Sequence, residues 1–192
     1  RHINDNDDIN IIKNIDLDIN LEVAATEEMV DFAIKYSPDF VCLVPENRKE
    51  ITTEGGINMD LDKVKKAIYK LKQNNLKISL FIDPSQENIK KAKELKVDYI
   101  ELHTGKYANL NDLKKNNEVE NIKNCAKFAK QLNIICNAGH GLNFDNVIPI
   151  ASIMEISELN IGHSIISSSI FNGLENTIKK MINIIKTCRY KD

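Results

Sequence analysis

The sequence predicts an α/β fold, a parallel (β/α)8 barrel of which six βα units are visible. Two observations lead to this expectation. Short apolar runs alternate with amphipathic helical stretches, and polar residues, histidines among them, follow the ends of several of these runs. In such barrels the carboxyl ends of the strands build one active site. We therefore expect the function of the chain to reside at the strand ends.

Six segments rich in Val, Ile, Leu and Phe are predicted as strands. Their apolar and polar residues alternate only weakly, which is typical of parallel strands covered on both faces. In chain order the segments span residues 19–25, 40–45, 78–83, 99–103, 134–138 and 159–166.

Amphipathic stretches between most of these segments are predicted as helices. Thr26 and Ser85 mark two helix starts, because each hydroxyl is followed by an acidic residue within two positions. The apolar stripes of three helices comprise Leu61, Val64, Ile68 and Leu71; Ile89, Ala92 and Leu95; and Ile122, Ala126, Ala129 and Leu132.

The number of βα units helps to choose between two architectures. A closed TIM barrel has eight βα units and typically about 250 residues, whereas this sequence has 192 and begins at Arg1 with a helical segment before its first strand. We expect residues 1–192 to be a single domain, the C-terminal three quarters of a barrel, with roughly two further units before Arg1 in the native chain. The alternative is an open doubly wound sheet, which usually carries a Gly-rich loop after its first strand.

The composition argues against several classes of protein. A formal net charge of −2 gives no reason to expect a nucleic acid or an acidic membrane surface as partner. No apolar run is long enough to span a bilayer, and no secretory signal precedes the first strand. Four cysteines without a Cys-x-x-Cys pair indicate buried thiols in a reducing compartment, so we expect a cytoplasmic protein.

Two carboxylates interrupt apolar strands. Glu22 lies within Asn-Leu-Glu-Val-Ala, and Glu101 lies two residues before His103. Burial would raise the pKa of Glu22 and make it a usable base near neutral pH, although a structural ion pair is the alternative. Two inward carboxylates on different strands favour an acid–base site.

Histidines next to glycines follow the last two predicted strands. His140 lies between Gly139 and Gly141, and His163 follows Gly162. The loops after the last two strands of a barrel often bind phosphate at a helix N-terminus. We therefore expect a phosphate site with imidazoles on its rim, and we favour a catalytic role for His140 over a structural one.

The segment 46–56 is a polar loop that ends in paired glycines. Such a loop can close over a substrate, and Thr52 and Thr53 offer hydroxyl donors, but an ordinary surface loop is an equal alternative. The segment from His103 to Tyr107 is equally open: the alternative to a functional role for His103 is a hydrogen bond within its own strand tip. Apart from Lys106 no lysine follows a predicted strand, which disfavours Schiff-base chemistry. No cluster of Asp and His residues has metal-ligand spacing, so no metal site is expected.

Five motifs carry a resemblance to a known family. They are Asn-Leu-Glu-Val-Ala-Ala-Thr-Glu-Glu-Met (20–29), Cys-Leu-Val-Pro-Glu-Asn-Arg-Lys-Glu-Ile-Thr-Thr-Glu-Gly-Gly (42–56), Ile-Glu-Leu-His-Thr-Gly (100–105), Asn-Ala-Gly-His-Gly-Leu (137–142) and Leu-Asn-Ile-Gly-His (159–163). Through them the chain closely resembles the pyridoxine 5'-phosphate synthases of vitamin B6 biosynthesis. That resemblance implies a barrel, typically an octamer, which condenses 1-deoxy-D-xylulose 5-phosphate with 3-amino-2-oxopropyl phosphate without an organic cofactor.

The resemblance also implies roles for particular residues. Glu22 would be a catalytic base, Glu101 a transition-state stabiliser and His140 the proton donor. The residues that match the substrate sites are His2 and Thr52 for the deoxyxylulose phosphate, and Gly141, Gly162 and His163 for the aminoketone phosphate.

The sequence departs from this family at its N-terminus. The family's first strand, with its Asn-x-Asp-His pattern, and its second strand, with a catalytic histidine and a nearby arginine, have no counterpart here, so the site is partial. Two other functions stay open: another phosphate-binding barrel enzyme, such as a sugar-phosphate epimerase or isomerase, and a non-catalytic ligand-binding barrel.

Overall fold

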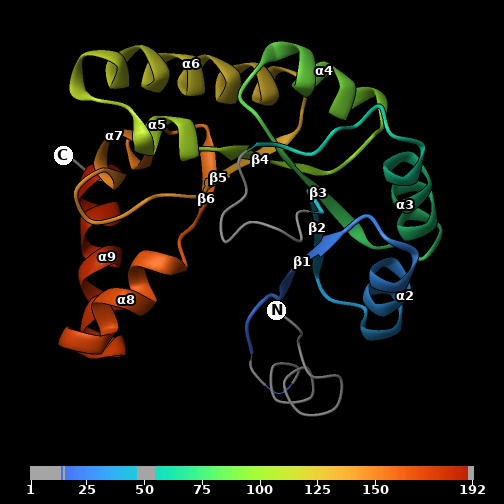
Figure 1. The fold of residues 1–192 in the computed structure, drawn as a ribbon, viewed down its shortest axis with the longest axis horizontal. Helices are drawn as coiled ribbons and strands as arrows, with labels where there is room; N and C mark the ends of the chain where they lie inside the picture. The colour runs from blue at the N-terminus through green and yellow to red at the C-terminus, as the bar shows by residue number, and fades with distance from the viewer. Residues whose placement is uncertain (1–13, 15, 47–54, 190–192) are drawn as a thin grey trace.

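The computed structural model describes residue 14 and residues 16–46 and 55–189 (Figure 1). Within these ranges six parallel strands form one sheet in the order of the chain, each paired with its sequence neighbours. The strands are β1 (Asn20–Ala24), β2 (Phe40–Val44), β3 (Lys77–Ile82), β4 (Tyr99–His103), β5 (Ile135–Gly139) and β6 (Ile156–Asn160).

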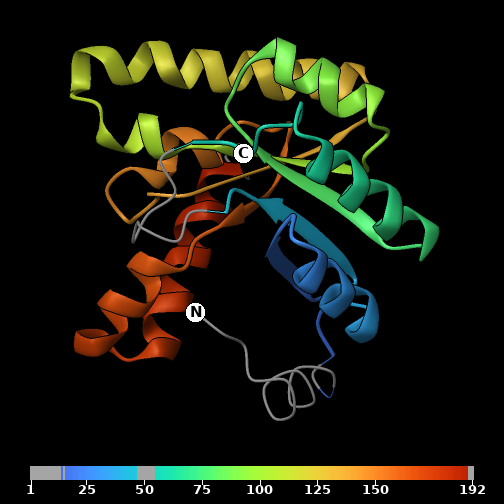
Figure 2. The same cartoon turned by 45° about the vertical axis from the view of Figure 1, so that its right-hand side comes forward.

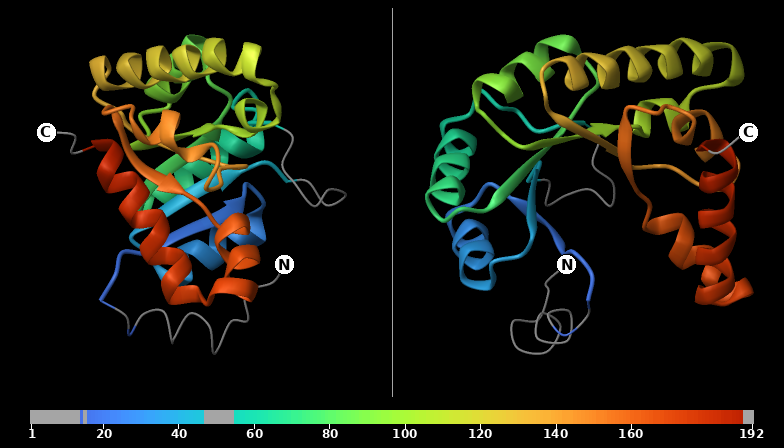
Figure 3. Two further views of the ribbon diagram at one scale, coloured as in Figure 1. Left: turned by 90° about the vertical axis from the view of Figure 1, so that its left-hand side faces the viewer. Right: turned by 180° about the vertical axis from the view of Figure 1, so that it is seen from behind.

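Helices follow the strands, as the alternation in the sequence predicts. The sheet is curved and most helices lie along its outer side (Figure 3), while β1 and β6 are its two edges and do not pair with each other (Figure 2). The parallel α/β architecture is therefore confirmed, and the barrel is not closed in the described ranges. The helices are α2 (Glu27–Tyr36), α3 (Asp62–Gln73), α4 (Gln86–Glu94), α5 (Gly105–Asn109), α6 (Asp112–Gln131), α7 (Val147–Ala151), α8 (His163–Asn172) and α9 (Leu174–Arg189).

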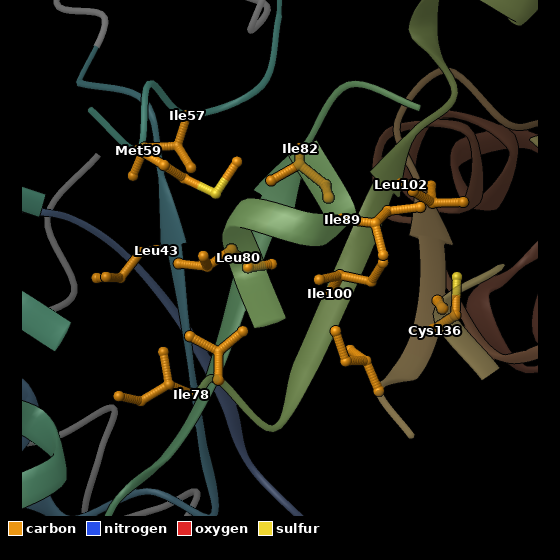
Figure 4. Packing of buried hydrophobic residues seen from close by; sticks show 14 of the residues in the cluster. Leu43, Ile57, Met59, Ile78, Leu80, Ile82, Ile89, Ile100, Leu102 and Cys136 are labelled. Carbon is orange, nitrogen blue, oxygen red and sulfur yellow. The ribbon is translucent and has the colours of Figure 1, made fainter. Parts of the chain in front are cut away.

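The two faces of the sheet differ more than the sequence suggests. Side chains directed toward the helices are apolar and form the main core, as Figure 4 shows for strands β2 to β5. Side chains on the concave face include polar residues on neighbouring strands: Glu22 is in register with Cys42, and Glu101 with Asn137. The curved sheet thus separates an apolar outer layer from a polar interior.

The predicted helix starts are confirmed. The Thr26 hydroxyl accepts a hydrogen bond from the Met29 amide at 3.3 Å, and the Ser85 hydroxyl accepts one from the Asn88 amide at 3.1 Å. Each bond satisfies an amide of the first turn that lacks a helical acceptor. The helical segment expected before the first strand lies almost wholly outside the described residues.

The predicted last strand was wrong in its extent. The sequence favours a strand over 159–166, but β6 ends at Asn160 and α8 begins at His163. A short apolar run does not by itself distinguish a strand from a helix, which is why the sequence favours a strand at Ile165 and Ile166 although both belong to α8. No helix within the described ranges is long and apolar enough to cross a membrane.

Candidate active site

Glu101 is a buried carboxylate on the concave face of β4. It is 3% exposed, and its Oε2 accepts hydrogen bonds from Asn160 Nδ2 at 2.7 Å and from the Cys42 thiol at 3.9 Å. Burial raises the pKa of Glu101 to about 7; the bond from Asn160 opposes this shift, and the charge of Glu22 adds to it. Glu101 can therefore take up or release a proton near neutral pH.

Glu22 belongs to the same electrostatic neighbourhood but is not buried as expected. It lies on β1, at one edge of the described sheet, and the residue is exposed. Partial removal of its carboxyl from water still raises its pKa. The sequence analysis did not identify Glu158 on β6 as a site residue. Its Oε1 accepts a hydrogen bond from Asn137 Nδ2 at 3.4 Å, and burial also raises its pKa. The interior therefore holds three carboxylates with raised pKa values.

His140 follows β5 in an unusual backbone conformation. Its φ is +80°, a region that side chains other than glycine occupy at some cost. Thr104 stabilises this turn, because its hydroxyl shares its proton between the Gly139 oxygen at 2.7 Å and the His140 oxygen at 2.6 Å. Burial, and then the neighbouring His103, lower the pKa of His140. The imidazolium of His140 therefore gives up its proton readily.

His103 contacts residues of two other strand tips, which the sequence does not indicate. The residue is 5% exposed, its Nδ1 lies 3.1 Å from Asp83 Oδ1, and its ring centroid lies 5.0 Å from that of His140. The hydrogen bond thus joins two strand tips instead of staying within one. Asp83 gave no signal of its own in the sequence, because it meets His103 only through the pairing of β3 with β4.

The loops after β5 and β6 meet, as the expected phosphate site requires. The Ser164 hydroxyl, in the first turn of α8, donates to the Leu142 oxygen at 2.8 Å. Gly141 has a φ of +76°, and a side chain at Gly162, just before α8, would meet nothing within 4 Å. His163 is exposed at the start of that helix. A helix N-terminus therefore faces open space beside the β5 tip.

The loop after β2 is only partly described. His2 and Thr52, both expected at a substrate site, lie outside the described residues, as does Thr53. Gly56 is described, and a Cβ there would lie 2.3 Å from the Asp83 amide nitrogen. This glycine permits a close backbone contact with the end of β3.

In the described ranges no group of three histidine, cysteine or acidic residues could hold a metal ion. The site instead consists of carboxylates and imidazoles at the ends of parallel strands around a polar interior. Fold and site together define a (β/α)-barrel enzyme with groups suited to proton transfer.

Comparison with known proteins gives the family. Residues 1–187 match the family model described as Pyridoxal phosphate biosynthesis protein PdxJ. Pyridoxine 5'-phosphate synthase of Zymomonas mobilis is 49% identical over 194 residues, which cover 100% of this chain and 76% of that relative. The same-named proteins of Prochlorococcus marinus strain AS9601 and Campylobacter lari are 46% and 45% identical, covering 96% and 97% of this chain and 79% and 82% of theirs. The chain belongs to the PdxJ family of pyridoxine 5'-phosphate synthases, enzymes of vitamin B6 biosynthesis.

A solved structure supports the fold independently. The tryptophan synthase A-subunit of Pyrococcus furiosus superposes with a TM-score of 0.59 over 92% of this chain and 68% of its own, at 11% sequence identity. Similarity at this level of identity concerns the TIM-barrel fold alone.

Proposed function

We propose that this protein condenses 1-deoxy-D-xylulose 5-phosphate with 3-amino-2-oxopropyl phosphate to form pyridoxine 5'-phosphate, inorganic phosphate and water. Family membership supports the product class. The observation that carries the proposal is a set of acid–base groups at the strand ends: Glu101 and Glu22, whose pKa values are raised, on the concave face, and His140, whose pKa is lowered, directly after β5. Addition of an amine to a ketone, loss of water and ring closure each need a proton to be moved.

The three side chains have different roles in this proposal. Glu22, exposed to the interior and raised in pKa, accepts a proton from the substrates as the general base. His140 donates a proton to a departing oxygen, and its lowered pKa makes the imidazolium a stronger acid. Glu101 is fixed by Asn160 and stabilises positive charge that develops on the reacting nitrogen.

Phosphate groups would hold the two substrates in place. Gly141, Gly162 and His163 are proposed for the aminoketone phosphate, supported by the open N-terminus of α8 beside the β5 tip. His2 and Thr52 are proposed for the deoxyxylulose phosphate on the family resemblance alone. Two anchored phosphates would align the amine with the ketone and lower the entropic cost of their reaction.

The same resemblance leads us to propose a homo-octamer that uses no organic cofactor, and the composition leads us to propose a cytoplasmic protein with neither nucleic acid nor membrane as partner. Light scattering of the purified full-length protein measures the subunit number. A monomer would contradict this part of the proposal without affecting the proposed reaction.

Turnover of the two substrates tests the proposed function. Pyridoxine 5'-phosphate should form only when both are present, and Glu22→Gln should lower kcat by at least about a hundredfold, because the amide has nearly the same shape but cannot take up a proton. Glu87→Gln, on the exposed first turn of α4, is the matched control and should retain activity. Isomerisation of one sugar phosphate alone, or binding of both substrates without product, would replace this proposal by one of the two alternative functions.

A further inference from the structure

His103 and His140 form a closely packed pair of imidazoles at neighbouring strand tips. Their ring centroids lie 5.0 Å apart, and Phe81 contacts both rings, with centroids 5.0 Å from His103 and 6.3 Å from His140. His103 is buried, whereas His140 is intermediate in exposure. The buried ring therefore forms one wall against which the more accessible ring rests.

Gly105 makes room for this pair. A Cβ at this first residue of α5 would lie 2.5 Å from His103 Nε2 and 2.9 Å from His140 Cδ2. Both distances are shorter than a real carbon contact allows, so any side chain at position 105 would have to displace the rings. The two imidazoles thus occupy space that the glycine leaves free.

The two nitrogens of His103 have different surroundings. A carboxylate only accepts hydrogen bonds, so Nδ1 donates to Asp83, whose side chain is 55% exposed. Nε2 is buried and has no hydrogen-bond partner among the described residues. A buried polar atom without a partner is costly, and such atoms require a specific explanation.

We propose that His103, held by Asp83, is a positioning residue for His140: its buried ring, packed against the His140 imidazole, fixes the orientation of that imidazole. This inference rests on the proposed role of His140 as proton donor. His103 acts through His140 and does not itself contact the substrates.

Other charged groups near His140 are engaged elsewhere. Glu101 on β4 binds Asn160, Lys106 on α5 is ion-paired with Glu118 at 2.6 Å, and Asp83 after β3 binds His103. The neighbouring His103 contributes to the lowered pKa of His140. Removal of the His103 imidazole should therefore raise the pH at which His140 loses its proton.

Histidine-selective NMR titration of the full-length protein between pH 5 and 8 measures this coupling without substrate. The His140 signal is assigned by its loss in His140→Asn. In His103→Phe, which keeps a ring of similar size, the His140 midpoint should rise by about half a pH unit or more. Asp60→Asn, which removes an exposed carboxylate from an ion pair with Lys91, is the matched control and should leave the midpoint unchanged. An unchanged midpoint in folded His103→Phe overturns the proposal.

Steady-state kinetics provide the second measurement. A proton donor works below its pKa, so the alkaline limb of the kcat profile should move to higher pH in His103→Phe. Because the His140 imidazole is no longer held in its orientation, kcat at pH 7 should fall about tenfold with KM nearly unchanged. Gly105→Ala keeps both histidines and inserts a methyl group at the rings, so it should lower kcat and shift the His140 signal even if His103→Phe fails to fold.

Wild-type kcat together with an unshifted His140 signal in Gly105→Ala would contradict the positioning role. Failure of the wild-type protein to convert the two substrates would instead contradict the proposed function, while the NMR titration would still test the coupling between the two rings.

Discussion

At the scale of single residues, burial shifts the pKa values of the acidic and basic groups of the site. Burial raises the pKa of the Glu101 carboxyl to about 7, while burial and His103 lower the pKa of His140. The polar interior thus lets Glu101 change its protonation state near neutral pH and makes the imidazolium of His140 a stronger acid.

His140→Asn should keep the fold and lose turnover. Asparagine tolerates positive φ better than most residues, so the backbone at φ +80° is preserved, but an amide cannot donate a proton as an imidazolium does. We expect kcat to fall by at least about a hundredfold with KM changed little. A raised KM at normal kcat would reassign His140 to substrate binding.

Because burial raises the pKa of Glu101, the free energy of unfolding should fall as the pH rises. Its pKa is higher in the folded state, so the folded protein binds more protons than the unfolded chain between pH 4.5 and about 7, and the free energy of unfolding falls across this window. The contribution, present in full below pH 4.5, is on the order of 3 kcal/mol.

Urea unfolding of wild type and Glu101→Gln at pH 5 and pH 8 measures this effect. The variant should lose most of the difference between the two pH values, with a residual slope from Glu22 and Glu158, whose pKa values are also raised. Glu87→Gln serves as the exposed control. Equal pH dependence in Glu101→Gln and wild type would show that this carboxyl is not the cause.

At the scale of elements, the adjacent glycines Gly55 and Gly56 differ in how closely the end of β3 approaches them. The Ile57 amide donates to the Phe81 oxygen at 2.7 Å, which brings Gly56 against the end of β3. A Cβ at Gly56 would lie 2.3 Å from the Asp83 nitrogen and 2.6 Å from the Ile82 Cα, whereas a Cβ at Gly55 would come no closer than 3.5 Å to the Asp83 carboxylate.

Gly56→Ala should therefore destabilise the protein by about 2 kcal/mol or more, since the obstructing atoms belong to the backbone and cannot rotate away. Gly55→Ala is the matched control and should change the free energy of unfolding by less than about 1 kcal/mol. Thermal unfolding of both variants measures the difference. Similar melting temperatures would rule out the close contact at Gly56.

Elements with local signals could be predicted from the sequence, and contacts between elements could not. The caps at Thr26 and Ser85 were predicted because a cap depends on residues three positions apart. The Asp83 to His103 bond joins residues twenty positions apart and follows only from the register of β3 with β4. The exposure of Glu22 also depends on its place in the sheet, since the same residue on an inner strand would be covered from both sides.

At the scale of the whole molecule, the last two helices present an apolar surface to solvent. Ile170 and Phe171 are 78% and 88% exposed. Other exposed apolar residues of the same helices are Ile166, Leu174, Ile178 and Ile182. Several large apolar side chains exposed on two neighbouring helices are typical of surfaces that are covered by protein or that promote aggregation.

A chain of residues 1–192 should accordingly bind the dye ANS and associate with itself at micromolar concentrations. Replacing both Ile170 and Phe171 by serine should reduce dye fluorescence and association without lowering the melting temperature. Met154→Ser, at a site 62% exposed outside these helices, should have little effect. Equal fluorescence of the double variant and the wild type would show that the surface on α8 and α9 is covered.

The order of the strands in the sheet has a consequence for how the chain folds as it is synthesised. Among the described residues, each strand pairs only with the strands immediately before and after it in the sequence. When a strand leaves the ribosome, the edge to which it will bind is thus already available, and the next helix can cover the new strand directly. Growth of the sheet from one edge keeps each loop closure short, so its entropic cost stays small at every step. Translation and folding can therefore proceed in the same direction, one βα unit at a time.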